Sequence, residues 1–284
     1  MDNRTGFRRH GPAFLADQAR QALGVSGEPR SLAEVPLPLV HTGFGAAVCA
    51  LAVLLRPQEI GLQTSAIADG VLAVMTVIAL TGYDVLVYPR DQRPGLEGAA
   101  LPGAAVVAFA TVLAGVTPLT VRAAAGVAAA LVIGGVPQLV ARRALGQESW
   151  LVRLLRDIAG VLVLAPVLLA GASPVLATTW RIALVGSVTA LVSFDGLRTE
   201  RLSRARAILA ALVIGGVIAG VAGLIGPSGA NAGVRAAILL VLWYGLRGMA
   251  GGFAVDARRG AALAEYAAFV IFAAGALRWI ALQG

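Results

Sequence analysis

Four polar residues recur on one face of an otherwise apolar stretch, residues 66–88, and they are the first candidates for chemistry in this chain. Asp69, Thr76, Tyr83 and Asp84 fall within an arc of about 100° if the stretch is helical. We call these four residues the polar stripe. An ionised side chain near the centre of a bilayer costs about 2.5 to 3.5 kcal/mol on insertion scales, so it normally faces protein or water. The polar stripe is therefore expected to face other helices.

Three arginines could place cations near one end of the polar stripe. Arg122, Arg181 and Arg235 each lie a few residues inside the start of a later apolar run. Three guanidinium groups around Asp69 would leave excess positive potential, which suits a phosphate or carboxylate ligand. In the alternative arrangement each arginine extends to the lipid headgroups, as arginines near helix ends routinely do, and Asp69 forms one ordinary ion pair.

A second group of charges lies near the other ends of the apolar runs. Arg153 and Asp157 are four residues apart and can pair along one helix face. Glu265 lies about four residues into the last run, where Arg247 or Arg258 could neutralise it. The sequence predicts buried ion pairs here, and a proton relay through Glu265 is the alternative.

Several chemistries are excluded by what the sequence lacks. The chain has one cysteine, Cys49, and two histidines, His10 and His41, too few for a thiolate metal site or a bis-histidine haem. It has no glycine-rich loop ending in Lys-Ser or Lys-Thr, so it carries no P-loop nucleotide site. We expect no metal and no cofactor. We also expect no nucleic-acid partner, because the basic residues are dispersed along the chain rather than gathered on one face.

The elements that must position these residues are long apolar runs. Apolar residues make up 58% of the 284 residues and charged residues only 13%, which leaves too little polar surface for a water-soluble protein. A helix needs about 20 apolar residues to cross a bilayer. Nine such runs predict an all-α integral membrane protein, a polytopic bundle of about nine transmembrane helices at residues 38–55, 66–88, 98–117, 119–141, 154–171, 176–194, 207–226, 233–251 and 261–282.

Two features of these runs affect how they pack. The runs 98–117 and 119–141 are separated by little more than Pro118, so a re-entrant pair is the alternative to two full crossings. Gly216 and Gly220 are four residues apart, as are Gly248 and Gly252, a spacing that lets helix backbones approach closely.

The distribution of arginine predicts the orientation. All 23 basic residues are arginine, and 18 of them lie in the N-terminal tail or at one set of loop ends. The opposite loop ends hold the other five, Arg56, Arg122, Arg181, Arg235 and Arg278. Arginine-rich short loops stay in the cytoplasm, so the N-terminus is predicted inside and the C-terminus outside. Arginine without lysine, together with abundant alanine, glycine and valine, is typical of a high-GC bacterial genome and indicates the bacterial cytoplasmic membrane.

The chain divides into a tail and a single membrane domain. Residues 1–36 are expected to form a cytoplasmic tail, either with an amphipathic helix at the membrane surface or disordered, and residues 37–284 a single polytopic domain. The densest basic loop, residues 196–206, is expected to contact anionic headgroups at the inner face. Membrane lipids are thus the expected partners, with other membrane subunits as further candidates.

Three function classes remain open. A permease or flippase-like carrier of a small or lipidic anion would use the polar stripe and the arginines Arg122, Arg181 and Arg235. A non-catalytic membrane subunit or scaffold would need no polar cavity. A lipid-modifying enzyme would need clustered acids at the inner face, and no recurring acidic array is present in the sequence. We therefore favour a non-enzymatic role and place the carrier first.

Overall fold

The computed structural model describes residues 39–88, 90, 93–116, 118–144, 149–172, 177–200, 202–224, 232–252 and 259–283. Within these ranges the chain forms nine long helices and one helix of four residues, and no strand. The helices are α2 (Leu39–Leu54), α3 (Pro57–Ile60), α4 (Leu62–Val87), α5 (Leu96–Gly115), α6 (Leu119–Ala144), α7 (Trp150–Ala172), α8 (Thr178–Thr199), α9 (Arg204–Leu224), α10 (Ala232–Gly252) and α11 (Arg259–Gln283). The tail predicted at residues 1–36 lies outside the described residues.

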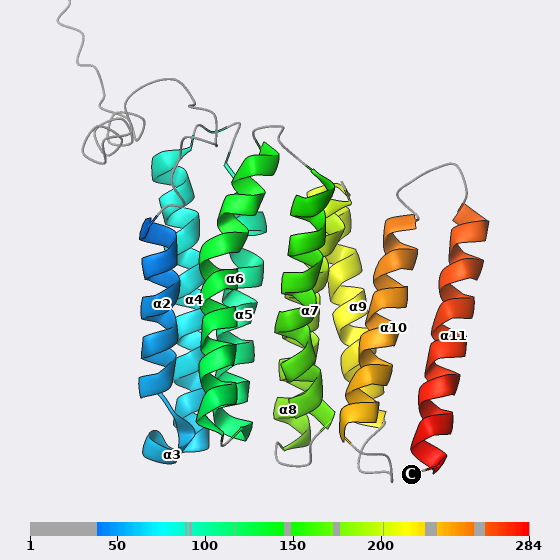
Figure 1. Cartoon of the computed structure of the whole chain (residues 1–284). Coiled ribbons are helices and arrows are strands. Elements are labelled where there is room, and N and C mark those ends of the chain that lie inside the picture. Colours follow the sequence, from blue (N-terminus) through cyan, green and yellow to red (C-terminus); the bar gives the residue numbers. More distant parts are fainter. Residues whose placement is uncertain are drawn as a thin grey trace, which may run out of the picture.

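The long helices stand side by side and alternate in direction (Figure 1). Helices α2, α5, α7, α9 and α11 begin at one end of the bundle, shown at the top, and α4, α6, α8 and α10 end there. We call this the arginine-rich end, because most of the arginines counted above fall on it, and we call the opposite end the far end. The described chain thus starts at the arginine-rich end, with α2, and finishes at the far end, with α11.

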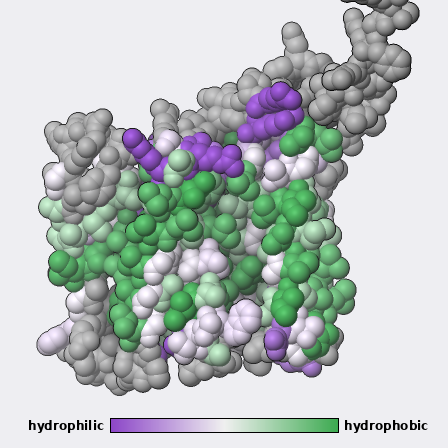
Figure 2. Space-filling model, turned by 180° about the vertical axis from the view of Figure 1, so that it is seen from behind, coloured by the Kyte–Doolittle hydropathy of each residue, from purple (hydrophilic) through white to green (hydrophobic). Residues whose placement is uncertain are grey.

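Seven of the helices, α4 to α10, are long and apolar enough to cross a membrane. Helices α2 and α11 contribute shorter apolar segments, His41–Leu54 and Ala264–Ala273. Figure 2 shows the surface such helices produce, with apolar side chains over the middle of the bundle and strongly hydrophilic ones gathered towards the arginine-rich end. An all-helical bundle of this kind suits a multi-pass membrane protein.

Helices α5 and α6 are both full-length, with 20 and 26 residues, and both belong to the seven. Their length and composition therefore favour two crossings over a re-entrant pair. The few residues around Pro118 suffice to reverse the chain, because α5 simply ends at Gly115 and α6 begins at Leu119.

Several helices extend beyond the predicted apolar runs. Helix α4 begins at Leu62 rather than residue 66, α7 at Trp150 rather than 154, and α9 at Arg204 rather than 207. An apolar run records where the chain contacts hydrocarbon, whereas the backbone hydrogen bonds of a helix continue through polar residues, and arginine is a good helix former.

One arginine outside the apolar runs caps the C-terminal end of α4. The Arg93 guanidinium donates from Nε to the Tyr88 carbonyl and from Nη2 to the Val85 carbonyl, each at 3.0 Å. These carbonyls belong to the end of α4, which lacks helical partners for them. This arginine thus stabilises a helix terminus in addition to adding charge at the arginine-rich end.

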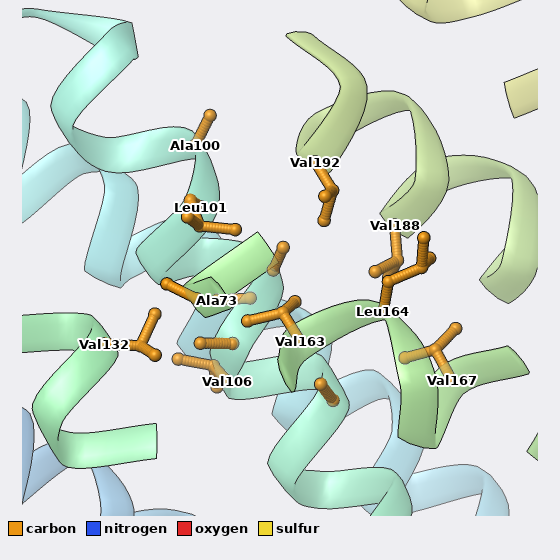
Figure 3. Close-up of a cluster of buried hydrophobic side chains, with 14 of the residues drawn as sticks. Ala73, Ala100, Leu101, Val106, Val132, Val163, Leu164, Val167, Val188 and Val192 are labelled. Carbon is orange, nitrogen blue, oxygen red and sulfur yellow. The ribbon is translucent and has the colours of Figure 1, made fainter. Parts of the chain in front are cut away.

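The core is built from alanine, valine and leucine rather than from large aromatics. Leu101 of α5, Leu164 and Val167 of α7 and Val185 of α8 are fully buried. Figure 3 shows part of this core, with side chains from α4, α5, α6, α7 and α8 meeting between the helices. Helix α8 lies at the centre, since it packs against α5, α7, α9 and α10.

The glycines singled out by spacing differ in their contacts. Gly248 of α10 lies in a close contact, since an added Cβ would be 2.2 Å from Cε1 of Tyr266 on α11. The close contact of α9 uses another glycine. A Cβ on Gly215 of α9 would lie 2.6 Å from the Gly186 carbonyl oxygen of α8, so the two backbones touch. Gly216 and Gly220 face open space, with nothing within 4 Å of an added Cβ. The expectation that Gly216 and Gly220 form the contact is wrong, because the packed face of α9 lies one residue away.

Candidate functional site

Helix α4 turns the polar stripe towards the bundle. Asp69, Thr76 and Asp84 are buried, as is Ser65 one turn before Asp69. The opposite face of α4 exposes large apolar side chains. Tyr83 is partly buried. The polar stripe therefore lies against the protein and the apolar side of α4 faces outward, as expected for a helix in a membrane bundle.

At the far end the hydrogen bonds of the stripe stay within a short segment of the chain. The Ser65 hydroxyl lies 2.5 Å from the Leu55 carbonyl oxygen and 3.1 Å from Asp69 Oδ2. The other carboxylate oxygen, Asp69 Oδ1, is buried without a hydrogen-bond partner among the described residues. Thr76 donates to the Leu72 carbonyl of its own helix at 2.8 Å. These contacts tie the stripe to its own part of the chain.

At the arginine-rich end the stripe meets α2 and the start of α5. The His41 ring of α2 packs edge-on against Tyr83, with 4.7 Å between the ring centroids. Both ring nitrogens of His41 are buried without a hydrogen-bond partner among the described residues. The backbone at Gly95 hydrogen-bonds to the Asp84 carboxylate, so this acid helps to fix the entry into α5.

The three predicted arginines lie on three different helices. Arg122 is in the first turn of α6, Arg181 near the start of α8 and Arg235 near the start of α10, all at the far end. Among the described residues, no ion pair links any of them to Asp69. Arg181 is only 6% exposed. The Nε atoms of Arg122 and Arg181 are buried without a hydrogen-bond partner in the described part of the chain.

The most deeply buried charges lie near the arginine-rich end. Arg156 of α7 donates from Nη2 to Asp195 Oδ1 of α8 at 2.5 Å, and the two residues are 2% and 3% exposed. The remaining Nε and Nη1 donors of Arg156 have no partner among the described residues. Removing one partner of such a pair would leave an uncompensated charge in the interior.

A second ion pair joins α10 to α7 and α8. Arg247 of α10 donates to Asp157 Oδ1 of α7 at 2.6 Å, and its Nε lies 3.4 Å from Glu200 Oε1 at the end of α8. The guanidinium carbon lies 5.7 Å from the Trp243 ring centroid, within cation–π range. A Cβ on Gly196 would lie 2.5 Å from Arg247 Nε, so this position must be small for the guanidinium to reach its partners.

A third pair is closer to solvent. Arg198 of α8 donates to Glu97 Oε1 of α5 from Nε at 2.6 Å and also donates to the Leu202 carbonyl. Together these contacts form what we call the ion-pair network: Glu97, Arg156, Asp157, Asp195, Arg198, Glu200 and Arg247. It connects α5, α7, α8 and α10 at one end of the bundle. Burial raises the pKa of the Glu200 carboxyl, and the neighbouring Arg247 partly offsets this.

Two of the four residues predicted for this end belong to the ion-pair network. Asp157 and Arg247 belong to the network, but Asp157 pairs with Arg247 of another helix, whereas Arg153, four residues before it, is exposed. Glu265 on α11 is exposed, and Arg247 pairs with Asp157 and Glu200. Thus the structure brings Asp157 and Arg247 together and leaves Arg153 and Glu265 outside the network.

Sequence reasoning from single helices missed most of the network. Arg156, Arg198 and Glu200 look like ordinary loop-flanking charges, and Glu97 like a helix N-terminal acid. A usable signal is depth, because Arg156, Asp195 and Arg247 each lie one to two turns inside a helix at the same end of the bundle. Opposite charges at equal depth in neighbouring helices are candidates for pairing.

Among the described residues, no group of three or more histidine, cysteine, aspartate or glutamate side chains could hold a metal ion. In comparisons with protein-family models, curated proteins and solved structures, nothing matches this chain. The functional argument therefore rests on the two polar regions: the polar stripe with the far-end arginines, and the ion-pair network.

Proposed function

We propose that the chain crosses the bacterial cytoplasmic membrane nine times, with its N-terminus inside and its C-terminus outside. In this arrangement α2 and each helix from α4 to α11 make one crossing. The alternation of helix direction supports it (Figure 1), and so does the partition of the 23 arginines into 18 and five. The arginine-rich end is then cytoplasmic, and the far end is external.

Within this topology the protein acts as a carrier of an anion, either small or lipidic. This proposal rests on buried guanidinium nitrogens at the far end. Arg122 and Arg181 each hold a buried Nε without an acceptor among the described residues. Buried polar groups normally have hydrogen-bond partners, and an unmade bond costs about 1 to 3 kcal/mol. An anionic ligand entering from the far end would supply acceptors.

The ion-pair network gives such a carrier a closed cytoplasmic end. Its pairs connect four helices through side chains rather than through covalent links. Charged side chains that pair inside membrane bundles often mark ion and substrate pathways. In the carrier, opening this end requires the pairs joining α5, α7, α8 and α10 to separate, and reclosing restores them.

The alternative is a non-catalytic subunit of a larger assembly, and α11 is the feature that favours it. Helix α11 packs chiefly on α10 and leaves Phe269, Ile271, Phe272 and Trp279 exposed. Lipid or another membrane protein could cover this face. A subunit of this kind would move no anion.

Reconstituted full-length protein distinguishes the two. Liposomes containing a trace of fluorescent phosphatidylglycerol are treated with dithionite, which bleaches only label in the outer leaflet. A carrier of lipidic anions exposes the inner-leaflet label as well, and fluorescent phosphatidylcholine is the comparison. Release of entrapped inorganic phosphate tests a small anion.

The double variant Arg122→Gln, Arg181→Gln is expected to abolish movement of the anion that the wild type carries. Arg206→Gln, an exposed arginine in the first turn of α9, is the matched control and is expected to retain it. If wild-type protein moves neither lipid nor phosphate, the carrier proposal is wrong and the subunit alternative takes its place.

A further inference from the structure

A groove opens on the bundle surface between α2, α5 and α6, near the far end. Its volume is about 240 Å³. Phe109 and Leu113 of α5 are buried and form its floor. Ala50 of α2 and Ala123 of α6 form facing walls, and both are exposed small residues. The lining is thus apolar along most of its length.

The groove exists because residues of α2 and α6 that line it are small. Nearer the arginine-rich end the two helices touch: a Cβ on Gly45 would lie 2.7 Å from the Ala130 carbonyl oxygen, and one on Gly134 would lie 2.9 Å from the His41 carbonyl oxygen. Further along, the Phe109 ring of α5 reaches Gly126 of α6, where an added Cβ would lie 3.2 Å from Cζ. Small side chains above this ring leave the space unfilled.

Two arginines line the same groove. Arg56 follows α2, and its Nε donates to the Val53 carbonyl at 3.1 Å, which holds the side chain at this helix end. Arg122 begins α6, and its Nε is the buried donor without a partner among the described residues. The groove therefore combines apolar walls with two guanidinium groups, and guanidinium binds phosphate oxygens with good geometry.

We propose that this groove binds one anionic phospholipid, with a segment of an acyl chain against Phe109, Leu113 and Ala123 and the phosphate at Arg56 and Arg122. The complementarity is in both charge and polarity: a free anion would leave the apolar walls uncovered, and a neutral lipid would bring no anionic charge to the buried Nε of Arg122. The site rests on the proposed membrane crossing, since the far end must lie at the headgroup level. It does not require that the lipid be transported.

Native mass spectrometry of the full-length protein in mild detergent tests the site, with dioleoyl phosphatidylglycerol and dioleoyl phosphatidylcholine as probes. Wild type is expected to retain one phosphatidylglycerol in preference to phosphatidylcholine. Ala123→Phe fills the groove and is expected to lose that lipid. Ala124→Phe, on the next residue of the same helix and outside the groove lining, is the matched control and is expected to keep it.

Charge is tested separately from shape. Arg122→Gln is expected to weaken phosphatidylglycerol binding about tenfold, the effect of losing one charge-assisted hydrogen bond, whereas Arg122→Lys retains most of the affinity. Should Ala123→Phe fail to fold, Ala50→Phe fills the groove from the other wall. Equal lipid retention by the filled and control variants would overturn the site, as would equal binding of the two lipids.

A third arm identifies the source of the phosphate. Inorganic phosphate at equal concentration is expected not to displace the lipid, because it gains nothing from the apolar walls. Displacement would show a free-anion site and overturn the lipid assignment. Lipid retained by a protein that moves neither lipid nor phosphate would support this site while contradicting the carrier proposal, so the two failures are distinguishable.

Discussion

Helices α4 and α8 both carry buried polar side chains through an apolar bundle, yet they satisfy them differently. On α4 the contacts are local: Ser65 reaches Leu55 and Asp69, and Thr76 reaches Leu72. On α8 they cross to other helices. Asp195 pairs with Arg156 of α7, and Ser193 accepts a hydrogen bond from the Trp243 indole of α10 at 2.9 Å.

The difference follows from position in the bundle. Helix α8 has neighbours on several sides, α5, α7, α9 and α10, so a polar side chain on almost any face meets another helix. Helix α4 packs mainly on α5, with smaller contacts to α2 and α3. A polar group there must find its partner nearby in sequence. We infer that polar residues on α8 hold the bundle together, whereas those on α4 can be changed with little effect on folding.

The largest effect is expected from Asp195→Asn. The substitution removes the charge that compensates Arg156 in the interior, and loss of one partner of a buried pair costs about 3 to 5 kcal/mol. Thermal unfolding in detergent, followed by circular dichroism, measures the loss. The double variant Arg156→Met, Asp195→Leu removes both charges and is expected to recover most of the stability. If Asp195→Asn is as stable as the wild type, the bundle does not depend on this pair of α8, and the contrast with α4 is wrong.

An intermediate effect is expected where α8 meets α9. Gly215→Ala places a Cβ 2.6 Å from the Gly186 carbonyl oxygen and 2.9 Å from the Ala190 Cβ, and overpacking of this kind costs about 1 to 3 kcal/mol. Gly216→Ala is the control with the same chemical change. Because it faces open space, alanine there is expected to stabilise the helix by up to about 1 kcal/mol. The same unfolding experiment should give opposite signs, and matching signs would contradict the close contact.

The smallest effect is expected from Asp69→Asn on α4, which repeats the chemistry of Asp195→Asn on the other helix. Among the described residues Asp69 has no cationic partner that the substitution would leave uncompensated, and asparagine can still hydrogen-bond to Ser65. The loss in unfolding free energy is expected to stay below about 1 kcal/mol. A loss as large as that of Asp195→Asn would show that α4 also depends on partners from other helices.

Much of the architecture could be predicted from the sequence, because crossing a membrane imposes a length and a polarity on each helix. Every predicted apolar run overlaps one long helix, and the periodicity of Asp69, Thr76 and Asp84 placed them correctly on one buried face. These features depend only on residues close together in sequence, and helical geometry determines them locally.

The ion-pair network could not be predicted in the same way. That Asp157 meets Arg247 rather than Arg153 depends on which helices are neighbours, and no local periodicity reveals this. The same limit applies to the glycines. Spacing favoured Gly216 and Gly220, but the rotation of α9 against α8 selects Gly215. The roles proposed for Asp69, Arg122, Arg181 and Arg235 as ligand-binding residues stay predictions.

The contact between α2 and α6 has a consequence for how the protein is made. Helix α2 leaves the ribosome first among the described helices, but the surface that receives Gly45 belongs to α6, Leu119–Ala144, which is synthesised after α4 and α5. In the proposed topology, the 16-residue α2 lies in the bilayer until then, with the side that later contacts α6 towards lipid. The packing of α2 is thus completed only after the later helices have been made. A nascent chain stalled before α6 would leave the packing face of α2 exposed to membrane chaperones.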